Sequence, residues 1–129
     1  MTEEEVWKKK KVCIVDDDQD IREIYLMKFT HEGFDVHLAE NGEMGMKIIR
    51  EQMPDIILLD LQMPVKGGVE VLEELNADPE LKKIPVIVLT NLENMEDIQR
   101  VLELGARTYL VKSNYALRDV IAKIQQACA

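Results

Sequence analysis

Short apolar runs alternate with segments of helical spacing along most of the chain. The runs occupy residues 12–15, 34–39, 56–59, 86–89 and 109–111. Three of them are continuously apolar and rich in β-branched residues, which is typical of parallel strands buried on both faces. In the second run Phe34, Val36 and Leu38 alternate with polar residues. This alternation predicts a strand at the edge of a sheet.

The segments between the runs place apolar residues on one face of a helix. The predicted inward faces are Ile21, Ile24, Tyr25 and Phe29; Met46, Ile49 and Met53; Val71, Leu72 and Leu75; Ile98, Val101 and Leu102; and Leu117, Val120, Ile121, Ile124 and Cys128. Asn41 before Gly42 predicts a helix start, and Gly105 predicts the C-terminal cap of a helix over 94–104. Each apolar run is therefore followed by a helix.

Five such strand–helix units in series predict an α/β fold, a parallel five-stranded sheet with helices on both faces. Strands one, three, four and five can be neighbours in the order 2-1-3-4-5. In open sheets of this kind the ligand site lies beyond the carboxyl ends of the strands. Residues that directly follow a strand are therefore the candidates for function.

Length and charge narrow the class of protein. The 129 residues suit one domain, which we expect over 11–129 after a charged tail over 1–10. A net charge of −9 opposes direct binding to nucleic acid or to an anionic membrane. The apolar runs are too short to span a bilayer, and two cysteines make no disulfide framework. We therefore expect a cytoplasmic protein.

Charged and hydroxyl side chains follow four of the five predicted strands. Asp16 and Asp17 follow the first, Asp60 the third, Thr90 the fourth and Lys112 the fifth. Clustered carboxylates repel one another, and a hard cation such as Mg²⁺ relieves that repulsion while binding phosphate. A hydroxyl and an ammonium can then bind phosphoryl oxygens. Asp60 stands alone at the central strand, so we assign it the role of nucleophile.

These strand-end residues carry a resemblance to a known family. Together with Met63, Pro64 and Gly68 after Asp60, and with Tyr109, they resemble the signature of response-regulator receiver domains. The resemblance runs from about residue 11 to the C-terminus. It implies the flavodoxin-like (βα)5 three-layer sandwich of that family and supplies part of the reason for the strand order.

The resemblance also implies a role for each site residue. Asp60 accepts a phosphoryl group from a phosphohistidine of a sensor histidine kinase or from a small phosphodonor. Asp17, Asp60 and the backbone carbonyl of Gln62 bind Mg²⁺ directly, whereas Asp16 holds it through water. Lys112 pairs first with the Asp60 carboxylate and then with the phosphoryl group.

A conformational switch is implied as well. Thr90 moves toward the phosphoryl oxygens, and Tyr109 turns inward into the space that is vacated. This reshapes the face formed by the fourth helix, the fifth strand and the fifth helix, where partners dock. The resemblance thus implies a stand-alone signalling switch rather than an enzyme, partnered by a sensor kinase or phosphotransfer protein and by a downstream target that the sequence does not name. It is expected to be a monomer or a phosphorylation-dependent homodimer, with no contact to nucleic acid or membrane.

Two positions, Ser113 and Asn91, depart from the family pattern, and Gln62 and Leu92 fall where members of the family tune the lifetime of the phosphoryl group. Ser113 follows Lys112 where the family usually has a cis proline, so this peptide is either trans or a strained cis bond. Asn91 replaces a small residue and is expected to narrow access to the phosphoryl group. Leu92 cannot position a hydrolytic water, which predicts slow loss of the phosphoryl group.

Two other functions share these residues. A haloacid-dehalogenase-like phosphatase also uses Asp, Thr, Lys and Mg²⁺, with its nucleophile after the first strand. Asp16 and Asp18 match that pattern, but Asp20 breaks it. The other alternative is a degenerate receiver that serves only as a binding module, which Ser113 and Asn91 keep open.

Overall fold

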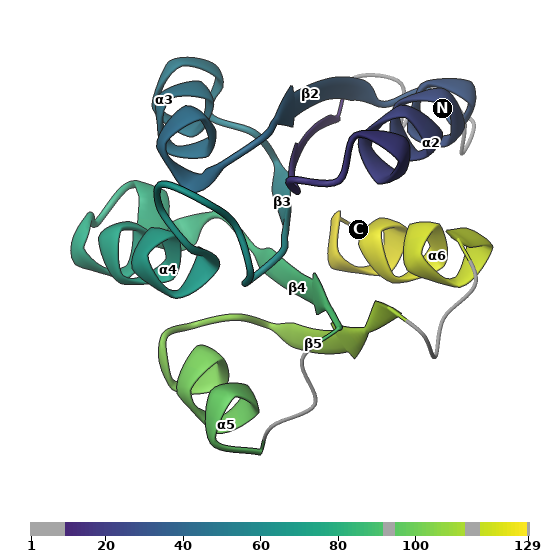
Figure 1. The fold of residues 1–129 in the computed structure, drawn as a ribbon. Coiled ribbons are helices and arrows are strands. Elements are labelled where there is room, and N and C mark those ends of the chain that lie inside the picture. Colours follow the sequence, from purple (N-terminus) through teal and green to yellow (C-terminus); the bar gives the residue numbers. More distant parts are fainter. Residues whose placement is uncertain (1–9, 92–94, 113–116, 129) are drawn as a thin grey trace.

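The computed structural model describes residues 10–91, 95–112 and 117–128 (Figure 1). Its elements in chain order are β1 (Lys11–Val15), α2 (Gln19–His31), β2 (Asp35–Ala39), α3 (Gly42–Gln52), β3 (Ile56–Leu59), α4 (Gly68–Ala77), the short 3₁₀ helix η1 (Leu81–Lys83), β4 (Val86–Thr90), α5 (Met95–Glu103), β5 (Thr108–Val111) and α6 (Leu117–Cys128). The strands form one parallel sheet in the order β2-β1-β3-β4-β5. The predicted fold and strand order are confirmed, and η1 is the element that the sequence pattern did not predict.

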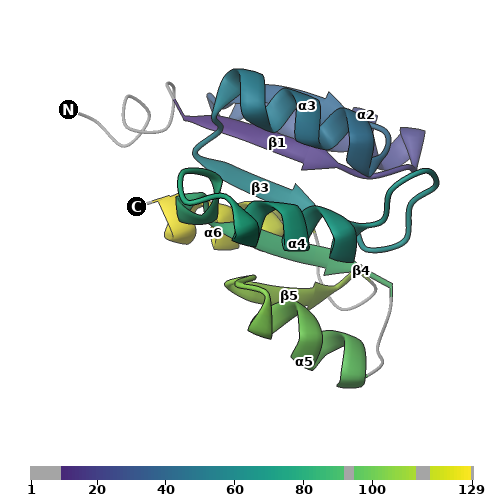
Figure 2. The same ribbon diagram turned by 90° about the vertical axis from the view of Figure 1, so that its left-hand side faces the viewer.

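The sheet is the middle of three layers. Helices α3, α4 and α5 lie on one face, and α2 and α6 lie on the other (Figures 1 and 2). Every strand pair is parallel, so the carboxyl ends of the strands meet at one edge of the sheet (Figure 2). This edge carries the residues on which the sequence predictions depend.

Buried apolar residues form two clusters, one on each face of the sheet. Cys13 and Val15 of β1 belong to the cluster under α3, α4 and α5, whereas Val12 and Ile14 belong to the cluster under α2 and α6. Alternate residues of β3 and β4 divide in the same way. The central strands are apolar throughout because both of their faces are covered. Val36 and Leu38 of the edge strand β2 are only partly buried.

Three residues placed on inward helix faces are exposed instead. Ile24 is 46% exposed and Leu102 45% exposed, so these two predictions are wrong. In α2 the buried residues are Tyr25 and Phe29, one turn apart, and the stripe facing the sheet is narrower than the apolar pattern. Met53 is also wrong: it ends α3 in a left-handed conformation with φ 45° and lies mostly outside the core.

The helix ends follow the predicted caps. The Asn41 side chain accepts a hydrogen bond from the Met44 N–H at 2.9 Å, which begins α3. Gly105 adopts φ 100°, and after it the Ala106 N–H donates to the Val101 carbonyl at 3.0 Å. A residue without Cβ is favoured in this conformation, which closes α5. Within the described parts of the chain, no helix is both long and apolar enough to cross a bilayer.

Candidate functional site

The register of β1 and β3 places two acidic residues side by side. Val15 pairs with Leu59 at the carboxyl ends of these strands, and Asp16 and Asp60 are the next residues. The Asp60 N–H donates to the Val15 carbonyl at 2.9 Å, which extends the ladder by one more bond. Both aspartates are buried, at 3% and 6% exposure. The backbone ladder itself therefore forces the two carboxylates into one neighbourhood.

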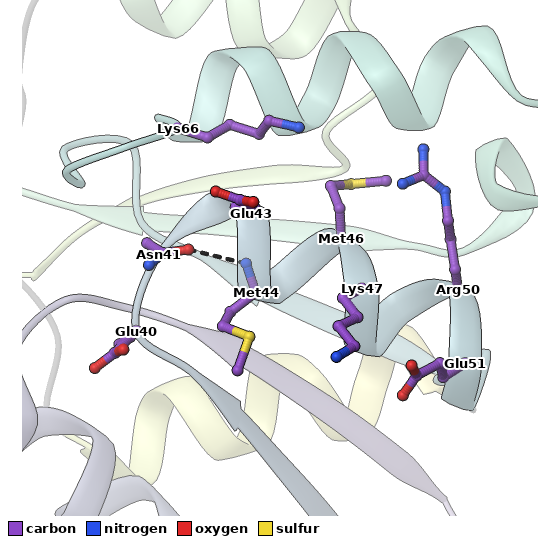
Figure 3. A pocket seen from close by; sticks show the side chains of 9 residues that line it. All are labelled: Glu40, Asn41, Glu43, Met44, Met46, Lys47, Arg50, Glu51 and Lys66. Atoms are coloured by element: carbon purple, nitrogen blue, oxygen red, sulfur yellow. Dashed lines mark hydrogen bonds between the residues drawn. The ribbon is translucent and has the colours of Figure 1, made fainter.

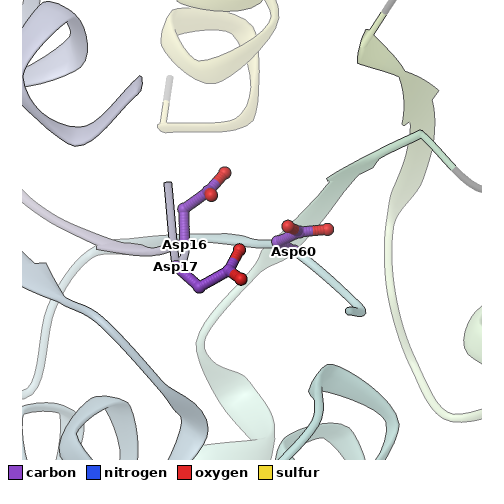
Figure 4. Close-up of side chains that lie close together, drawn as sticks. All are labelled: Asp16, Asp17 and Asp60. Carbon is purple, nitrogen blue, oxygen red and sulfur yellow. The ribbon is translucent and has the colours of Figure 1, made fainter. Parts of the chain in front are cut away.

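Asp17 completes a cluster of three carboxylates. Each of Asp16, Asp17 and Asp60 offers an oxygen, and these oxygens lie within 4.8 Å of one another. Figure 4 shows Asp16 and Asp17 coming from the tip of β1 and Asp60 from the tip of β3. Asp17 is exposed, so the cluster opens to solvent on one side. Three hard oxygen donors at this spacing fit a small divalent cation such as Mg²⁺, which keeps waters as its remaining ligands.

Lys112 reaches the cluster from the end of β5. Its ammonium lies 2.7 Å from Asp16 Oδ2 and 3.3 Å from Asp60 Oδ2. Burial lowers the pKa of Lys112, but the hydrogen bond to Asp16 and the charge of Asp60 outweigh it, so the pKa stands above its ordinary value. The lysine is thus cationic at neutral pH. The resemblance implied a first pairing with Asp60, whereas the closer contact here is with Asp16.

Asp16 is the most strongly held of the three carboxylates. Burial raises the pKa of its carboxyl group, although hydrogen bonds from Lys112 and from the Asp18 N–H oppose that rise. The Asp18 N–H donates to Asp16 Oδ1 at 3.0 Å. Each carboxylate oxygen of Asp16 therefore already has a donor. This arrangement suits a residue that would hold a cation through water.

Two residues of α2 border the cluster and were not predicted as part of it. The Arg22 guanidinium donates to the Asp16 carbonyl at 2.7 Å, which ties α2 to the tip of β1. Burial, and then the charges of Asp16 and Asp60, raise the pKa of Tyr25 to about 12. In the sequence, the helical spacing of Tyr25 predicts a core residue and nothing more. No sequence pattern predicts the contact of Arg22, because its hydrogen-bond acceptor is a backbone carbonyl, which every residue has.

Thr90 and Tyr109 lie on the neighbouring strands β4 and β5. Thr90 is fully buried at the last position of β4 and pairs with Val111, directly before Lys112. Tyr109 pairs with Val88 and is half-buried, and it packs against the core cluster under α3, α4 and α5. The strand ends thus gather Asp16, Asp17, Asp60 and Lys112 at one place, where Lys112 contacts Asp16 and Asp60, and they put Thr90 on the strand next to β3.

The loop after Asp60 is folded back toward the cluster. The Gln62 N–H donates to Asp60 Oδ1 at 3.4 Å, and the Gly68 N–H donates to the Leu61 carbonyl at 3.1 Å. A Cβ at Gly68 would collide with the Asp60 carbonyl oxygen and lie 2.8 Å from Leu61 Cα. Gly68 is therefore needed for the close approach of α4 to this loop, which explains the glycine in the motif.

The expectations for Asn91, Leu92 and Ser113 all stay predictions. Asn91 follows β4 as an exposed residue in a bend. Leu92 and Ser113 lie outside the described residues, so the Lys112–Ser113 peptide and the lifetime of the phosphoryl group stay predictions. A hollow of about 730 Å³ lies beside α3 and is lined by Asn41, Lys66 and seven other residues, none of them from the acidic cluster (Figure 3).

The chain matches a known protein family, and the site described above is consistent with that match. The response regulator receiver domain family matches residues 12–125, which is nearly the whole described chain. The chain belongs to the response regulator receiver domain family. Proteins of this family are signalling switches in two-component systems, and the acidic cluster at the strand tips fits their phosphorylation site.

Solved structures extend the likeness to the whole fold. The chemotaxis protein CheY4 of Vibrio cholerae is 26% identical, with 92% of this chain and 98% of that chain covered and a TM-score of 0.85. The receiver domain of the Francisella response regulator 1452 is 28% identical, with 92% and 96% covered and a TM-score of 0.84. The Mn²⁺-bound form of the response regulator Rcp1 is 31% identical, with 91% and 90% covered and a TM-score of 0.74.

Proposed function

We propose that this receiver takes a phosphoryl group onto Asp60 in a reaction that depends on Mg²⁺. The main support for this proposal is that Asp16, Asp17 and Asp60 lie together with the Lys112 ammonium at one end of the sheet. The family match favours this function over a phosphatase, whose nucleophile would follow β1 instead of β3. The contacts among the three acids and the lysine also argue against a degenerate module that only binds.

Asp17, Asp60 and the Gln62 carbonyl would hold the cation directly, and Asp16 would hold it through water. Bound Mg²⁺ supplies positive charge next to the phosphoryl oxygens, as divalent cations do in phosphoryl transfer. The exposure of Asp17 supports this division, because a cation can enter from its side. Both carboxylate oxygens of Asp16 already accept a hydrogen bond, which supports the proposal that Asp16 holds the cation through water and not directly.

In the transfer itself, a carboxylate oxygen of Asp60 bonds to phosphorus as the bond from phosphorus to the donor breaks. The electron pair leaves with the donor group, which is acetate from acetyl phosphate or the imidazole of a phosphohistidine. The departing imidazole takes its proton from solvent. Lys112 moves from Asp60 onto the incoming phosphoryl oxygens, where its charge stabilises the transition state.

The output of the switch would run through β4 and β5. The Thr90 hydroxyl donates to a phosphoryl oxygen on Asp60, and Tyr109 turns inward beside it. Because Tyr109 lies on β5, this movement alters the face formed by α5, β5 and α6. A sensor kinase or a phosphotransfer protein would supply the phosphoryl group, and a separate protein target would read that face. The domain proposed for this function covers residues 11–129, and its place of action is the cytoplasm.

Acetyl phosphate tests the proposal directly. The purified chain is incubated with acetyl phosphate and Mg²⁺, and its intact mass is measured beside that of Asp60→Asn and of a sample with EDTA. We expect one hydroxylamine-labile phosphoryl group on the wild type and none on the variant or with EDTA. A phosphoryl group on Asp60→Asn in equal yield, or catalytic turnover of phosphate esters, would overturn the proposal.

A further inference from the structure

The loop that leads from Asp60 to α4 holds a strained residue. Val65 adopts φ 68°, and around it the Lys66 N–H donates to the Pro64 carbonyl at 2.7 Å. A β-branched residue rarely adopts this left-handed conformation, which persists only where the surroundings impose it. Val65 is 74% exposed, so its own side chain contributes little to holding the turn. Something else must keep the loop in place.

Lys66, the next residue, anchors this loop to two helices. Its carbonyl accepts a hydrogen bond from the Gly42 N–H at 3.0 Å, at the start of α3. Its ammonium pairs with Glu74 Oε1 on α4, and the other oxygen of Glu74 lies 3.5 Å from Arg50 Nη2 on α3. Lys66 and Arg50 extend toward α4 from the loop and from α3 respectively (Figure 3). Glu74 is thus shared by two cations from two different segments.

The same loop carries the residue that would complete the metal site. Gln62 lies between Asp60 and the strained turn, and its N–H already contacts Asp60 Oδ1. Lys66 and Glu74 are both partly buried, so their attraction is screened less than that of a fully exposed pair. Loss of the anchor would let the turn relax and the backbone at Gln62 shift away from Asp60.

We propose that Glu74 is a positioning residue of the metal site: through Lys66 and Arg50 it holds the loop so that the Gln62 carbonyl faces the carboxylates. The inference rests on the proposed function, since it concerns the affinity of that site for its cation. Groups that orient metal ligands from outside the ligand shell commonly alter affinity strongly. Glu74 would act in this way although it touches no ligand itself.

Binding of Mn²⁺, followed by electron paramagnetic resonance of the free ion, tests this without any phosphodonor. We expect Glu74→Gln and Lys66→Met each to weaken Mn²⁺ binding about tenfold. The double variant should lose no more affinity for Mn²⁺ than either single variant, because the two residues act through one contact. Lys66→Arg, which keeps the charge, should bind Mn²⁺ like the wild type.

Glu73→Gln is the matched control. Glu73 is the neighbouring residue on α4, and it pairs with Arg100 Nη2 on α5 at 2.7 Å, so its substitution removes the same charge and a similar ion pair. Its effect on Mn²⁺ binding should stay within about twofold. Equal losses for Glu73→Gln and Glu74→Gln would overturn the positioning role. A wild type that binds no Mn²⁺, or binds it as well after Asp17→Asn, would overturn the metal site itself and both proposals with it.

Discussion

Lys112 donates a hydrogen bond to Asp16 at 2.7 Å, although 96 residues separate the two in the chain. The same ammonium lies 0.6 Å farther from Asp60, at 3.3 Å against 2.7 Å. Lys112 therefore offsets part of the negative charge of the two buried carboxylates. A divalent cation held by the same carboxylates, as we propose, would compete with the lysine for that charge.

Lys112→Met tests this competition. Without the ammonium, the carboxylates lose their resident positive charge, so Mn²⁺ should bind several-fold more tightly, by roughly 1 kcal/mol. Phosphorylation by acetyl phosphate should nevertheless become roughly 100-fold slower, because one charge that stabilises the transition state is gone. Both effects are measured on the same variant, by Mn²⁺ titration and by time-resolved intact mass. Parallel loss of binding and rate would contradict the competition.

Gly68→Ala tests the close packing behind Asp60. The new Cβ would collide with the Asp60 carbonyl and with Leu61, so the backbone must shift. We expect the free energy of unfolding to fall by about 2 kcal/mol, measured by urea denaturation. Gly67→Ala is the control, since a Cβ there would meet only the Leu61 carbonyl oxygen at 3.3 Å. Similar losses of unfolding free energy for both variants would show that the close approach of Gly68 to the Asp60 carbonyl is not important for the packing of this loop.

Alkaline pH should weaken the fold through Cys13. Burial raises the pKa of this thiol to about 12 from its ordinary value of 9.0. The folded protein therefore keeps a proton that the unfolded chain loses first. The contribution of the protonated Cys13 thiol to the free energy of unfolding is complete below pH 9. It declines from there up to pH 12, by about 1.4 kcal/mol per pH unit.

The comparison of wild type with Cys13→Ala isolates this contribution, because Tyr25, which also titrates late, is present in both. Urea unfolding at several pH values should show a steeper decline for the wild type above pH 9. Identical slopes would mean that the thiol is not protected by burial.

Val65→Gly should stabilise the protein. Glycine has no Cβ to strain at the φ of 68° that valine adopts here, and little burial is lost at an exposed position. We expect a gain of about 1 kcal/mol in the free energy of unfolding, read from thermal and urea denaturation. A loss of stability would show that valine is not strained in this turn.

The sequence predicts the sheet well, and each predicted strand lies within one residue of its observed bounds. The central strands are marked by continuous apolar runs, since a strand buried on both faces tolerates few polar residues inside it. The edge strand β2 is marked by alternation instead, because it is only partly buried. Asp16, Asp60 and Lys112 were found by the rule that function gathers at the carboxyl ends of parallel strands. The structure places them together at that edge, with the Lys112 ammonium paired to both aspartates.

Helix faces and long-range backbone contacts were harder to predict. Ile24 and Leu102 fit the apolar periodicity but lie outside the stripe that meets the sheet, and an exposed aliphatic residue costs the fold little. The contact from Arg22 to the Asp16 carbonyl and the link from Lys66 through Glu74 to Arg50 depend on how whole segments pack. No local pattern in the sequence encodes either contact.

The position of the phosphoryl group tests the role of Asp60 most directly. Borohydride reduces an aspartyl phosphate to homoserine, which marks the acylated residue in a peptide map. After incubation with acetyl phosphate and Mg²⁺, we expect homoserine at position 60 and unchanged aspartate at positions 16 and 17. Homoserine at position 16, the nucleophile expected of the alternative phosphatase, or at none of the three positions would contradict that role.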